Sequence, residues 1–392
     1  MARSRAALAA LVAASTASAA AKAPNIIFFL TDDQDVDMQS LAYMPALKAN
    51  LVDAGATFTR MYAHVPVCCP SRSSLISGQY MHNNGCRGNS LGVNCSSPAF
   101  QKGPETRSYT VGLQAAGYRT SYAGKYLNDY GDPAAGGVAH LPPGWTNWQG
   151  LVGNSRYYDY TLSNNGVAEV HGSDYATDYL PMLVLNKTLA FLEANLGAAP
   201  VFAVLSTPSC HGPQTAAPQH QGAFPNARAP RNPSFNASVA ATSWIQMTRG
   251  GYTFDDNAAS FSDLVFRRRV QTLQTVDEML VSVIELLREK GELDNTYIVY
   301  TADNGCVGGA RLTGRAKGAH TAATAERSLR PPPHRTTRLA RPALPPAQLP
   351  CGRVWPRVRQ AAAVGHGHAP AAAHSRAGRR GGLEHGRARL DG

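Results

Sequence analysis

The chain has 392 residues, of which 44% are hydrophobic, so its length allows one large globular domain or two ordinary ones. It has 37 basic and 26 acidic residues, a net charge of +11. Residues 318–392 contain 13 arginines, no lysine and 3 acidic residues, a net charge of +10, which leaves only +1 for residues 1–317. The basic charge therefore belongs to the tail, and it gives no reason to interpret the rest of the chain as a nucleic-acid-binding protein.

The first 19 residues are typical of a secretory signal peptide. Arg3 and Arg5 form a charged start, residues 6–14 are a short apolar run, and residues 17–19 (Ala-Ser-Ala) form a small-residue cleavage site. An Ala-rich disordered leader is the alternative. The apolar run is too short to span a bilayer and no later segment is long enough, so we expect an exported protein, extracellular, in the cell wall or in a lysosome-like compartment, without a membrane span. Export also agrees with N-glycosylation sequons at three positions, Asn94, Asn186 and Asn236.

Four apolar or β-prone runs lie along the chain after this leader. They cover residues 25–30, 118–122, 201–205 and 296–300. Runs of this kind, apolar without alternation, are expected of strands that are buried on both faces of a parallel sheet.

Helical patterns stand between these runs. Residues 178–196 and 266–290 have apolar side chains at three- and four-residue spacing, and Gly291 ends the second pattern. Residues from about 130 to 175 and from about 210 to 260 are rich in Gly, Pro, Asn and Ser, and we expect long surface loops there. Strands that alternate with helices predict an α/β fold, with a doubly wound, mostly parallel sheet and helices on both of its faces.

Each predicted strand leads into residues that can carry chemistry. In chain order these residues are Asp32 and Asp33, then Lys125, then His211, and finally Asp303 and Asn304. In a doubly wound sheet such residues gather beyond the carboxyl ends of the strands. Carboxylates and an amide, without sulfur or imidazole, suit a hard cation such as Ca²⁺ or Mg²⁺ rather than zinc. The lysine and the histidine are able to hold an anionic oxygen or protonate a leaving group.

Taken singly, each of these residues also has an ordinary structural explanation. The paired acids can cap a helix or turn, the lysine can be a solvated surface charge, and the histidine can be a satisfied loop residue. Only the complete set, at the ends of neighbouring strands, indicates an active site.

The run from Val67 to Arg72 contains the pattern Cys68-x-Pro70-x-Arg72. We expect a helix to begin near Ser71, and a helix N-terminus favours anions. A helix-start turn with a buried or disulfide-bonded cysteine pair is the alternative interpretation. The chain has 7 cysteines, and Cys86 and Cys95 are close enough in sequence for a local disulfide, but spacing does not determine the pairing. No CxxC or Cys/His spacing typical of a zinc site is present.

Together these motifs resemble the formylglycine-dependent sulfatases of the alkaline-phosphatase-like superfamily. Within that family the chain is similar to the N-acetylglucosamine-6-sulfatase branch, which also contains extracellular glucosamine sulfatases and algal arylsulfatases. The matching segments occur in family order between about residues 24 and 317. They are Thr31-Asp-Asp-Gln-Asp35, Cys68-Cys-Pro-Ser-Arg72, Asn94-Cys-Ser-Ser97, Ala123-Gly-Lys-Tyr-Leu-Asn-Asp129, Thr215-Ala-Ala-Pro-Gln219 and Thr301-Ala-Asp-Asn-Gly305.

The resemblance implies that a formylglycine-generating enzyme oxidises Cys68 to an aldehyde. One hydroxyl of the hydrated aldehyde would attack the sulfur of a sulfate ester, and the other would then expel sulfate. It also implies a site for Ca²⁺, rather than Mg²⁺, made by residue 68 together with Asp32, Asp33, Asp303 and Asn304. Arg72 would stabilise the hydrate, and three further residues would contact the sulfate, namely Lys125, His211 and Lys317. The substrate would be a sulfated glycan, such as a glycosaminoglycan with N-acetylglucosamine 6-sulfate groups, or an aryl sulfate.

The chain departs from the family pattern at several points. Leu127 stands where many sulfatases have a histidine, which we interpret as a subfamily character, and Cys306 replaces the usual aromatic residue after Asp-Asn-Gly. Beyond Lys317 the family continues into further strands and a small C-terminal subdomain, and this chain does not. Residues 20–317 would therefore form an incomplete catalytic domain.

The tail, residues 318–392, has no Lys, Ile, Met, Phe, Tyr or Asn and no helix or strand periodicity. We expect it to be disordered, as a genuine basic tail or as the product of a frame shift. Two functions remain open at this point: an active exported sulfatase, or a truncated, non-catalytic product that keeps the motifs of the site.

Overall fold

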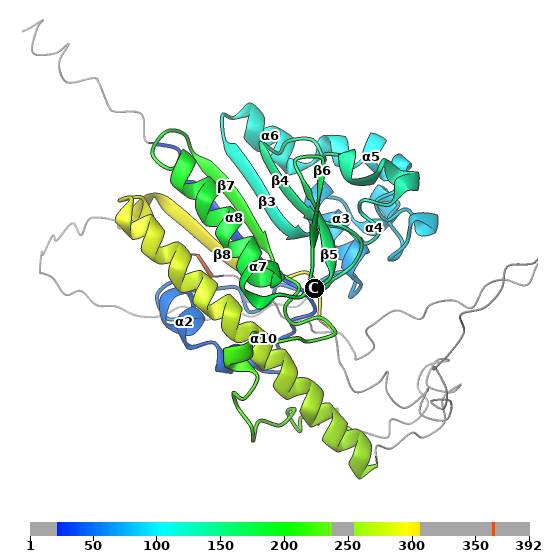
Figure 1. Cartoon of the computed structure of the whole chain (residues 1–392), viewed down its shortest axis with the longest axis vertical. Coiled ribbons are helices and arrows are strands. Elements are labelled where there is room, and N and C mark those ends of the chain that lie inside the picture. The colour runs from blue at the N-terminus through cyan, green and yellow to red at the C-terminus, as the bar shows by residue number, and fades with distance from the viewer. Residues whose placement is uncertain (1–21, 234, 237–254, 306–362, 365–392) are drawn as a thin grey trace, which may run out of the picture.

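The computed structural model describes residues 22–233, 235–236, 255–305 and 363–364. The predicted signal peptide, Lys317, Cys306 and nearly all of the predicted tail lie outside these residues. A seven-stranded sheet in the order β6-β5-β4-β3-β7-β1-β8 forms the centre of the described part (Figure 1). Its strands are β1 (Asn25–Thr31), β3 (Arg119–Lys125), β4 (Asn147–Leu151), β5 (Tyr160–Asn164), β6 (Val167–His171), β7 (Val201–Ser206) and β8 (Thr296–Ala302).

Strands β4, β3, β7, β1 and β8 are parallel, and β5 and β6 extend the sheet as an antiparallel pair. The expected α/β fold with a doubly wound, mostly parallel sheet is confirmed. All four strands predicted from apolar runs are present, as β1, β3, β7 and β8, and they lie next to one another in the order β3-β7-β1-β8. Their carboxyl ends therefore meet at one edge of the sheet.

Helices cover both faces of the sheet (Figure 1). The α-helices are α2 (Pro45–Leu47), α3 (Cys68–Ser77), α4 (Met81–Asn84), α5 (Pro98–Lys102), α6 (Tyr109–Ala115), α7 (Tyr175–Asp178), α8 (Leu180–Asn195) and α10 (Asp256–Glu289). Single-turn 3₁₀ segments lie at Ser40–Tyr43, Leu91–Val93, Glu105–Arg107, Pro133–Ala135, Gly137–Ala139, Pro218–His220 and Leu293–Asn295, and a π-helical turn lies at Lys48–Val52. None of the described helices is both long enough and apolar enough to cross a membrane.

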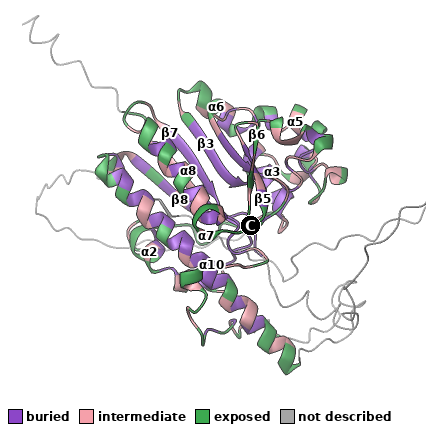
Figure 2. Cartoon of the chain, in the orientation of Figure 1, coloured by how far each residue is buried: buried purple, intermediate pink, exposed green. Residues whose placement is uncertain are grey.

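The two faces of the sheet bury separate hydrophobic cores, because successive side chains of a strand point to opposite sides. On β1, Ile27 and Phe29 pack with α8 and α10, while Ile26 and Phe28 pack against the core that includes residues of α3 and α5. Figure 2 shows the central strands as almost entirely buried. This explains why the sequences of β1 and β7 are continuously apolar over residues 26–30 and 201–205.

The loop predicted over residues 130–175 is wrong in part, since this region contains β4, β5 and β6. These strands have five residues each, and their polar side chains obscure the strand pattern. One sequence signal was nevertheless present, because Asn165-Gly166 joins β5 to β6 with both residues at positive φ, 48° and 91°. Asn-Gly in a two-residue connection is typical of a β-hairpin.

The two predicted helices are α8 and α10, but α10 begins ten residues before the predicted start at 266. Its first turn is capped by Asp255, whose carboxylate accepts a hydrogen bond from the Ala258 amide. An aspartate at this position is a normal helix start, and the apolar pattern alone does not reveal it. In the tail, the structure describes only the two-residue strand β9 (Ala363–Val364), which pairs with β2 (Ala56–Thr57).

A disulfide joins Cys69 at the start of α3 to Cys95, 26 residues later in the chain, with Cα atoms 5.9 Å apart. Cys86, the other candidate for a local bridge, remains a buried free thiol.

We expect Cys95→Ser to lower the free energy of unfolding by about 3.5 kcal/mol, since a closed loop of this length restricts the unfolded chain. Denaturant unfolding with Cys86→Ser as the control tests this, and equal stability of both variants would contradict it.

Candidate active site

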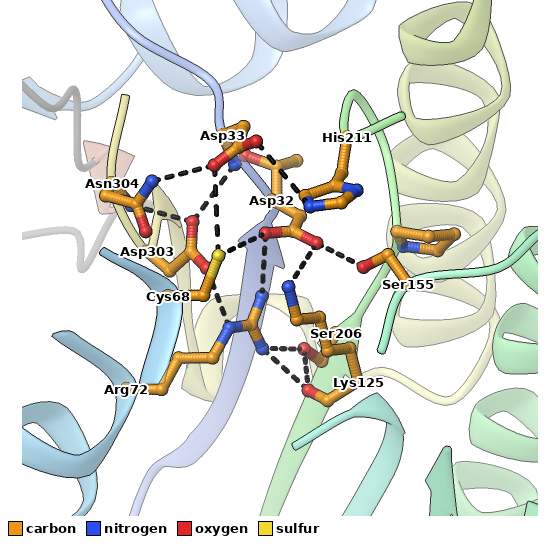
Figure 3. A network of polar contacts seen from close by, with 12 residues as sticks. Asp32, Asp33, Cys68, Arg72, Lys125, Ser155, Ser206, His211, Asp303 and Asn304 are labelled. Carbon is orange, nitrogen blue, oxygen red and sulfur yellow. Dashed lines mark hydrogen bonds and ion pairs between the residues drawn. The ribbon is translucent and has the colours of Figure 1, made fainter. Parts of the chain in front are cut away.

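The chemistry-bearing residues predicted from the sequence meet at one place, beyond the carboxyl ends of the four adjacent strands (Figure 3). Thr31 of β1 lies opposite Ala302 of β8. Asp32 and Asp303 are the residues that directly follow these two, so they lie side by side just beyond the ends of the strands. The Asp33 amide donates a hydrogen bond to Asp303 Oδ1 at 3.0 Å, and the Asn304 side-chain amide donates one to Asp33 Oδ1 at 2.7 Å. All four side chains are buried.

Asp33 has a φ of +62°, in the left-handed region that a non-glycine residue seldom adopts. The surrounding hydrogen bonds hold it there, and the conformation turns its carboxylate toward Asn304. Strained backbone of this kind is common at functional sites.

Cys68 is the first residue of α3 and lies within this group. Its Sγ is 3.9 Å from Asp32 Oδ1 and 4.0 Å from Asp33 Oδ1, and it is buried. Burial raises the pKa of the Cys68 thiol well above its usual value, against the opposing charge of Lys125. The unmodified thiol therefore stays protonated at neutral pH, and as such it is a poor nucleophile.

Arg72, one helical turn after Cys68, anchors α3 to the ends of three strands, β3, β7 and β8. Its Nε donates to Asp303 Oδ2 at 2.7 Å, and one terminal nitrogen donates to the Lys125 carbonyl and the Ser206 hydroxyl, at 2.6 and 2.8 Å. The other terminal nitrogen is buried without a hydrogen-bond partner among the described residues and lies 3.8 Å from Asp32 Oδ1. Arg72 thus compensates the buried carboxylates and still has one donor to offer.

Lys125 is the last residue of β3, and its Nζ donates to Asp32 Oδ2 at 2.7 Å. Both side chains are fully buried. Burial opposes ionisation of Asp32, but the positive charge of Lys125 and its neighbours outweighs it and lowers the pKa of this carboxyl. Gly124 precedes the lysine because a Cβ there would lie 1.9 Å from the Ser206 carbonyl oxygen, and this close approach of β3 to β7 brings Lys125 into the site.

His211 lies on the loop that follows β7, with Nε2 3.8 Å from Asp33 Oδ2. Its Nδ1 is 2.7 Å from the Gly212 carbonyl oxygen, which can only accept, so Nδ1 carries a hydrogen. Nε2 is then the nitrogen available to a bound group. With 22% of its side chain exposed, His211 is more accessible than Lys125 or Asp32.

The donor set fits a hard divalent cation. Ligand atoms of Asp32, Cys68 and Asp303 lie within 4.8 Å of one another, and Asn304 Oδ1 is buried without a hydrogen-bond partner among the described residues. Burial, and then the charge of Asp32, raise the pKa of Asp303 against the opposing positive charges of Arg72 and Lys125. Carboxylate and amide oxygens are the ligands that Ca²⁺ and Mg²⁺ prefer.

Three residues of the site were not predicted from the sequence. Ser155 donates to Asp32 Oδ2, Ser206 accepts from Arg72, and Arg269 of α10 donates to the Asp33 carbonyl oxygen at 2.5 Å. Ser206 is the last residue of β7, as Lys125 is the last residue of β3, so its position carried the same signal. Ser155 follows a strand that was not predicted, and Arg269 stands within a helical pattern where an arginine is ordinarily assigned to solvent.

The remaining predicted residues are placed as follows. Leu127 is fully buried in the core beside α3, so no polar group occupies its position. Asn186, on α8, and Asn236 are exposed, whereas Asn94 is half-buried and its side-chain oxygen accepts from the Ser97 hydroxyl. Lys317 lies outside the described residues.

Comparison with known proteins gives a family match. The sulfatase family model matches residues 24–330. The chain is 42% identical over 289 residues to N-acetylglucosamine-6-sulfatase of Homo sapiens, covering 74% of this chain and 52% of that one. It is 44% identical over 292 residues to an extracellular sulfatase SULF-1 homolog of Drosophila melanogaster, covering 74% and 25%. It is 31% identical over 336 residues to an arylsulfatase of Volvox carteri, covering 78% and 50%.

Among solved structures, the fold is similar to that of a protein in complex with its substrate D-glucosamine-2-N,6-O-disulfate. The TM-score is 0.57 at 22% identity, and the match covers 72% of this chain and 66% of that one. The chain spans about half the length of the N-acetylglucosamine-6-sulfatases that it matches.

Proposed function

The chain belongs to the sulfatase family, and on that premise we propose that it hydrolyses sulfate esters with a formylglycine formed from Cys68 and a bound divalent cation. The observation that carries the proposal is the convergence of Asp32, Asp33, Asp303 and Asn304 on residue 68, with cationic side chains beside them. Such a set can hold an anion at a nucleophile and neutralise the charge that develops during transfer.

Residue 68 is the proposed nucleophile because Cys68 has a proline two residues and an arginine four residues further on, whereas Cys69 does not. Cys69 is also held in the disulfide with Cys95. The Cys68 Sγ marks where the hydroxyls of a hydrated aldehyde would stand, between two carboxylates and close to Arg72. Its burial keeps bulk water away from an intermediate bound there.

The neighbouring cations have distinct proposed roles. The terminal nitrogen of Arg72 that has no hydrogen-bond partner among the described residues would donate to a hydroxyl on residue 68. Lys125 and His211 Nε2 would bind the oxygens of the sulfate group. As the imidazolium, with a hydrogen on Nε2 as well as on Nδ1, His211 would donate to such an oxygen or give the Nε2 proton to the leaving group, and its exposure supports this role. We include Lys317 among these contacts on the family resemblance alone.

Ca²⁺ is the proposed cation, held by Asp32, Asp33, Asp303, Asn304 and residue 68, because oxygen donors of this kind form flexible sites that suit its size. When bound, it would supply positive charge to the sulfate oxygens as a Lewis acid. Lys125 and Arg72 already balance part of the carboxylate charge, so the chain orders the ligands before an ion arrives.

The proposed substrate is a glycan with N-acetylglucosamine 6-sulfate groups, such as a glycosaminoglycan. Support comes from the names of the relatives at 42% identity and from the 6-O-sulfated glucosamine bound by the structural neighbour. An aryl sulfate is the alternative suggested by the algal relatives. We further propose that the chain enters the secretory pathway, where a formylglycine-generating enzyme would act on it, because relatives include extracellular sulfatases.

Sulfate release by the full chain tests the function. The chain is co-expressed with a formylglycine-generating enzyme, loaded with Ca²⁺, and assayed on N-acetylglucosamine 6-sulfate and on an aryl sulfate. Release from the sugar supports the proposal, and release from the aryl sulfate alone would replace the substrate. A folded, formylglycine-containing, Ca²⁺-bound chain that releases sulfate from neither would establish the second function, a non-catalytic sulfatase-like product.

A further inference from the structure

Arg269, in the middle of α10, is a buried arginine outside the set of residues that surround Cys68. It is only 3% exposed, and one terminal nitrogen donates to the Asp33 carbonyl oxygen at 2.5 Å. The other donates to the Cys210 carbonyl oxygen at 3.5 Å. A single guanidinium thus contacts two loops that leave different strands, β1 and β7.

These two loops already pair with each other. The Asp32 amide donates to the Ser209 carbonyl at 2.7 Å, and the Cys210 amide donates to the Asp32 carbonyl at 2.8 Å. Arg269 contacts the next carbonyl oxygen of each loop, those of Asp33 and Cys210. The guanidinium therefore joins the two loops one residue beyond their last backbone hydrogen bond.

The positions it fixes are those that matter for the proposed chemistry. Asp33 is buried and at positive φ. Without the guanidinium, its carbonyl oxygen would lose the hydrogen bond from Arg269 that satisfies it. Cys210 immediately precedes His211, whose Nε2 faces Asp33 Oδ2. Hence one side chain controls both a proposed metal ligand and a proposed sulfate contact.

A third loop is within reach through Asp35. Asp35 Oδ2 lies 3.8 Å from the Arg269 guanidinium and has no hydrogen-bond partner among the described residues. The Asp35 side chain packs on Gly305, where an added Cβ would be 2.5 Å from Asp35 Cβ. Gly305 follows Asn304, so Asp35 links Arg269 indirectly to the loop after β8.

We propose that Arg269 is a positioning residue, which clamps the loops after β1 and β7 so that Asp33 and His211 face the same bound group. The inference rests on the proposed function for the roles of those two residues. It requires the planar, two-pronged guanidinium, because the two carbonyl oxygens are contacted by different nitrogens. A lysine at this position keeps the charge but reaches only one of them.

The test compares Arg269→Gln and Arg269→Lys with Arg268→Gln, a matched control at an exposed position of the same helix. Ca²⁺ affinity is measured by calorimetry on chain with unconverted Cys68, which makes this readout independent of turnover. We expect both Arg269 variants to bind Ca²⁺ about 10- to 100-fold more weakly, the usual scale for a residue that orients metal ligands. At saturating Ca²⁺ on converted chain, kcat should still fall about tenfold or more, because His211 is no longer held.

Arg268→Gln should leave Ca²⁺ affinity and kcat within about twofold of the unmodified chain, since surface substitutions of this kind have small effects. Normal Ca²⁺ affinity and kcat in Arg269→Lys would overturn the inference, because charge alone would then suffice. Failure of both Arg269 variants to fold in Ca²⁺ would overturn it as well, by assigning the residue to stability. If the unmodified chain binds Ca²⁺ but releases no sulfate, the proposed function fails while the affinity comparison still decides the role of Arg269.

Discussion

Cys68→Ala is expected to reduce sulfate release to the uncatalysed background, a loss on the order of 10⁴-fold or more, as when a catalytic nucleophile is removed. Two other side chains of α3 that carry a hydroxyl or a sulfur are engaged elsewhere. The Ser71 hydroxyl donates to the Asp303 carbonyl, and Cys69 is held in a disulfide. The measurement is sulfate release from N-acetylglucosamine 6-sulfate by chain expressed with a formylglycine-generating enzyme.

Cys69→Ser is the matched control for this substitution. It leaves Cys68, Pro70 and Arg72 in place, so residue 68 should still be converted, and activity per folded molecule should be retained although the chain is less stable. Peptide mass spectrometry should find formylglycine at residue 68 in both the unmodified chain and the control. An active chain in which Cys68 remains an unmodified thiol would contradict the assignment.

The raised pKa of the Cys68 thiol also argues against the unmodified cysteine as the nucleophile. Burial keeps this thiol protonated, so the chain does not favour a thiolate at the position where a nucleophile is needed. In the proposed mechanism the nucleophile would instead be one hydroxyl of the hydrated aldehyde, and the second hydroxyl, which a thiol lacks, would allow sulfate to be expelled.

The site residues that could be predicted from the sequence follow strands that are buried on both faces of the sheet. In β1, β7 and β8 the run of apolar side chains ends abruptly at a polar residue, and this end is also where the strand leaves the sheet. Parallel neighbours bring such ends together, so the convergence of Asp32 and Asp303 at one edge followed from the fold class. That β1 and β8 are neighbours, with Thr31 opposite Ala302, is known only from the structure.

The residues that were missed depend on tertiary contacts with no local pattern. Arg269 is a polar residue in an amphipathic helix, and only the position of α10 over the strand ends makes it a buried one. Likewise, the sulfur atoms of Cys69, Cys86 and Cys95 all lie within 4.8 Å of one another, and spacing in the sequence does not encode which two of them are joined.

Asn304→Ala is expected to remove most of the activity at micromolar Ca²⁺ by weakening cation binding about 10- to 100-fold. The substitution changes no net charge. It deletes a buried oxygen without a described hydrogen-bond partner and the donor that holds Asp33 Oδ1 at 2.7 Å. Asp33→Ala and Asp32→Ala should abolish turnover as well, but Asp32→Ala also strands the buried Lys125 charge, so its effect mixes binding with stability.

The cleanest measurement is therefore the melting temperature of the unconverted chain with and without Ca²⁺. Ligand at about 100 times its dissociation constant stabilises a folded protein by about 2.7 kcal/mol, so chelation should lower the melting temperature of the unmodified chain measurably. Asn304→Ala should show little of this shift at the same Ca²⁺ concentration and should recover it, together with activity, as Ca²⁺ is raised. Asn83→Ala, at an exposed position, should respond as the unmodified chain does. An undiminished Ca²⁺ shift in Asn304→Ala would show that the cation binds without this amide oxygen, and the proposed ligand set would then be wrong.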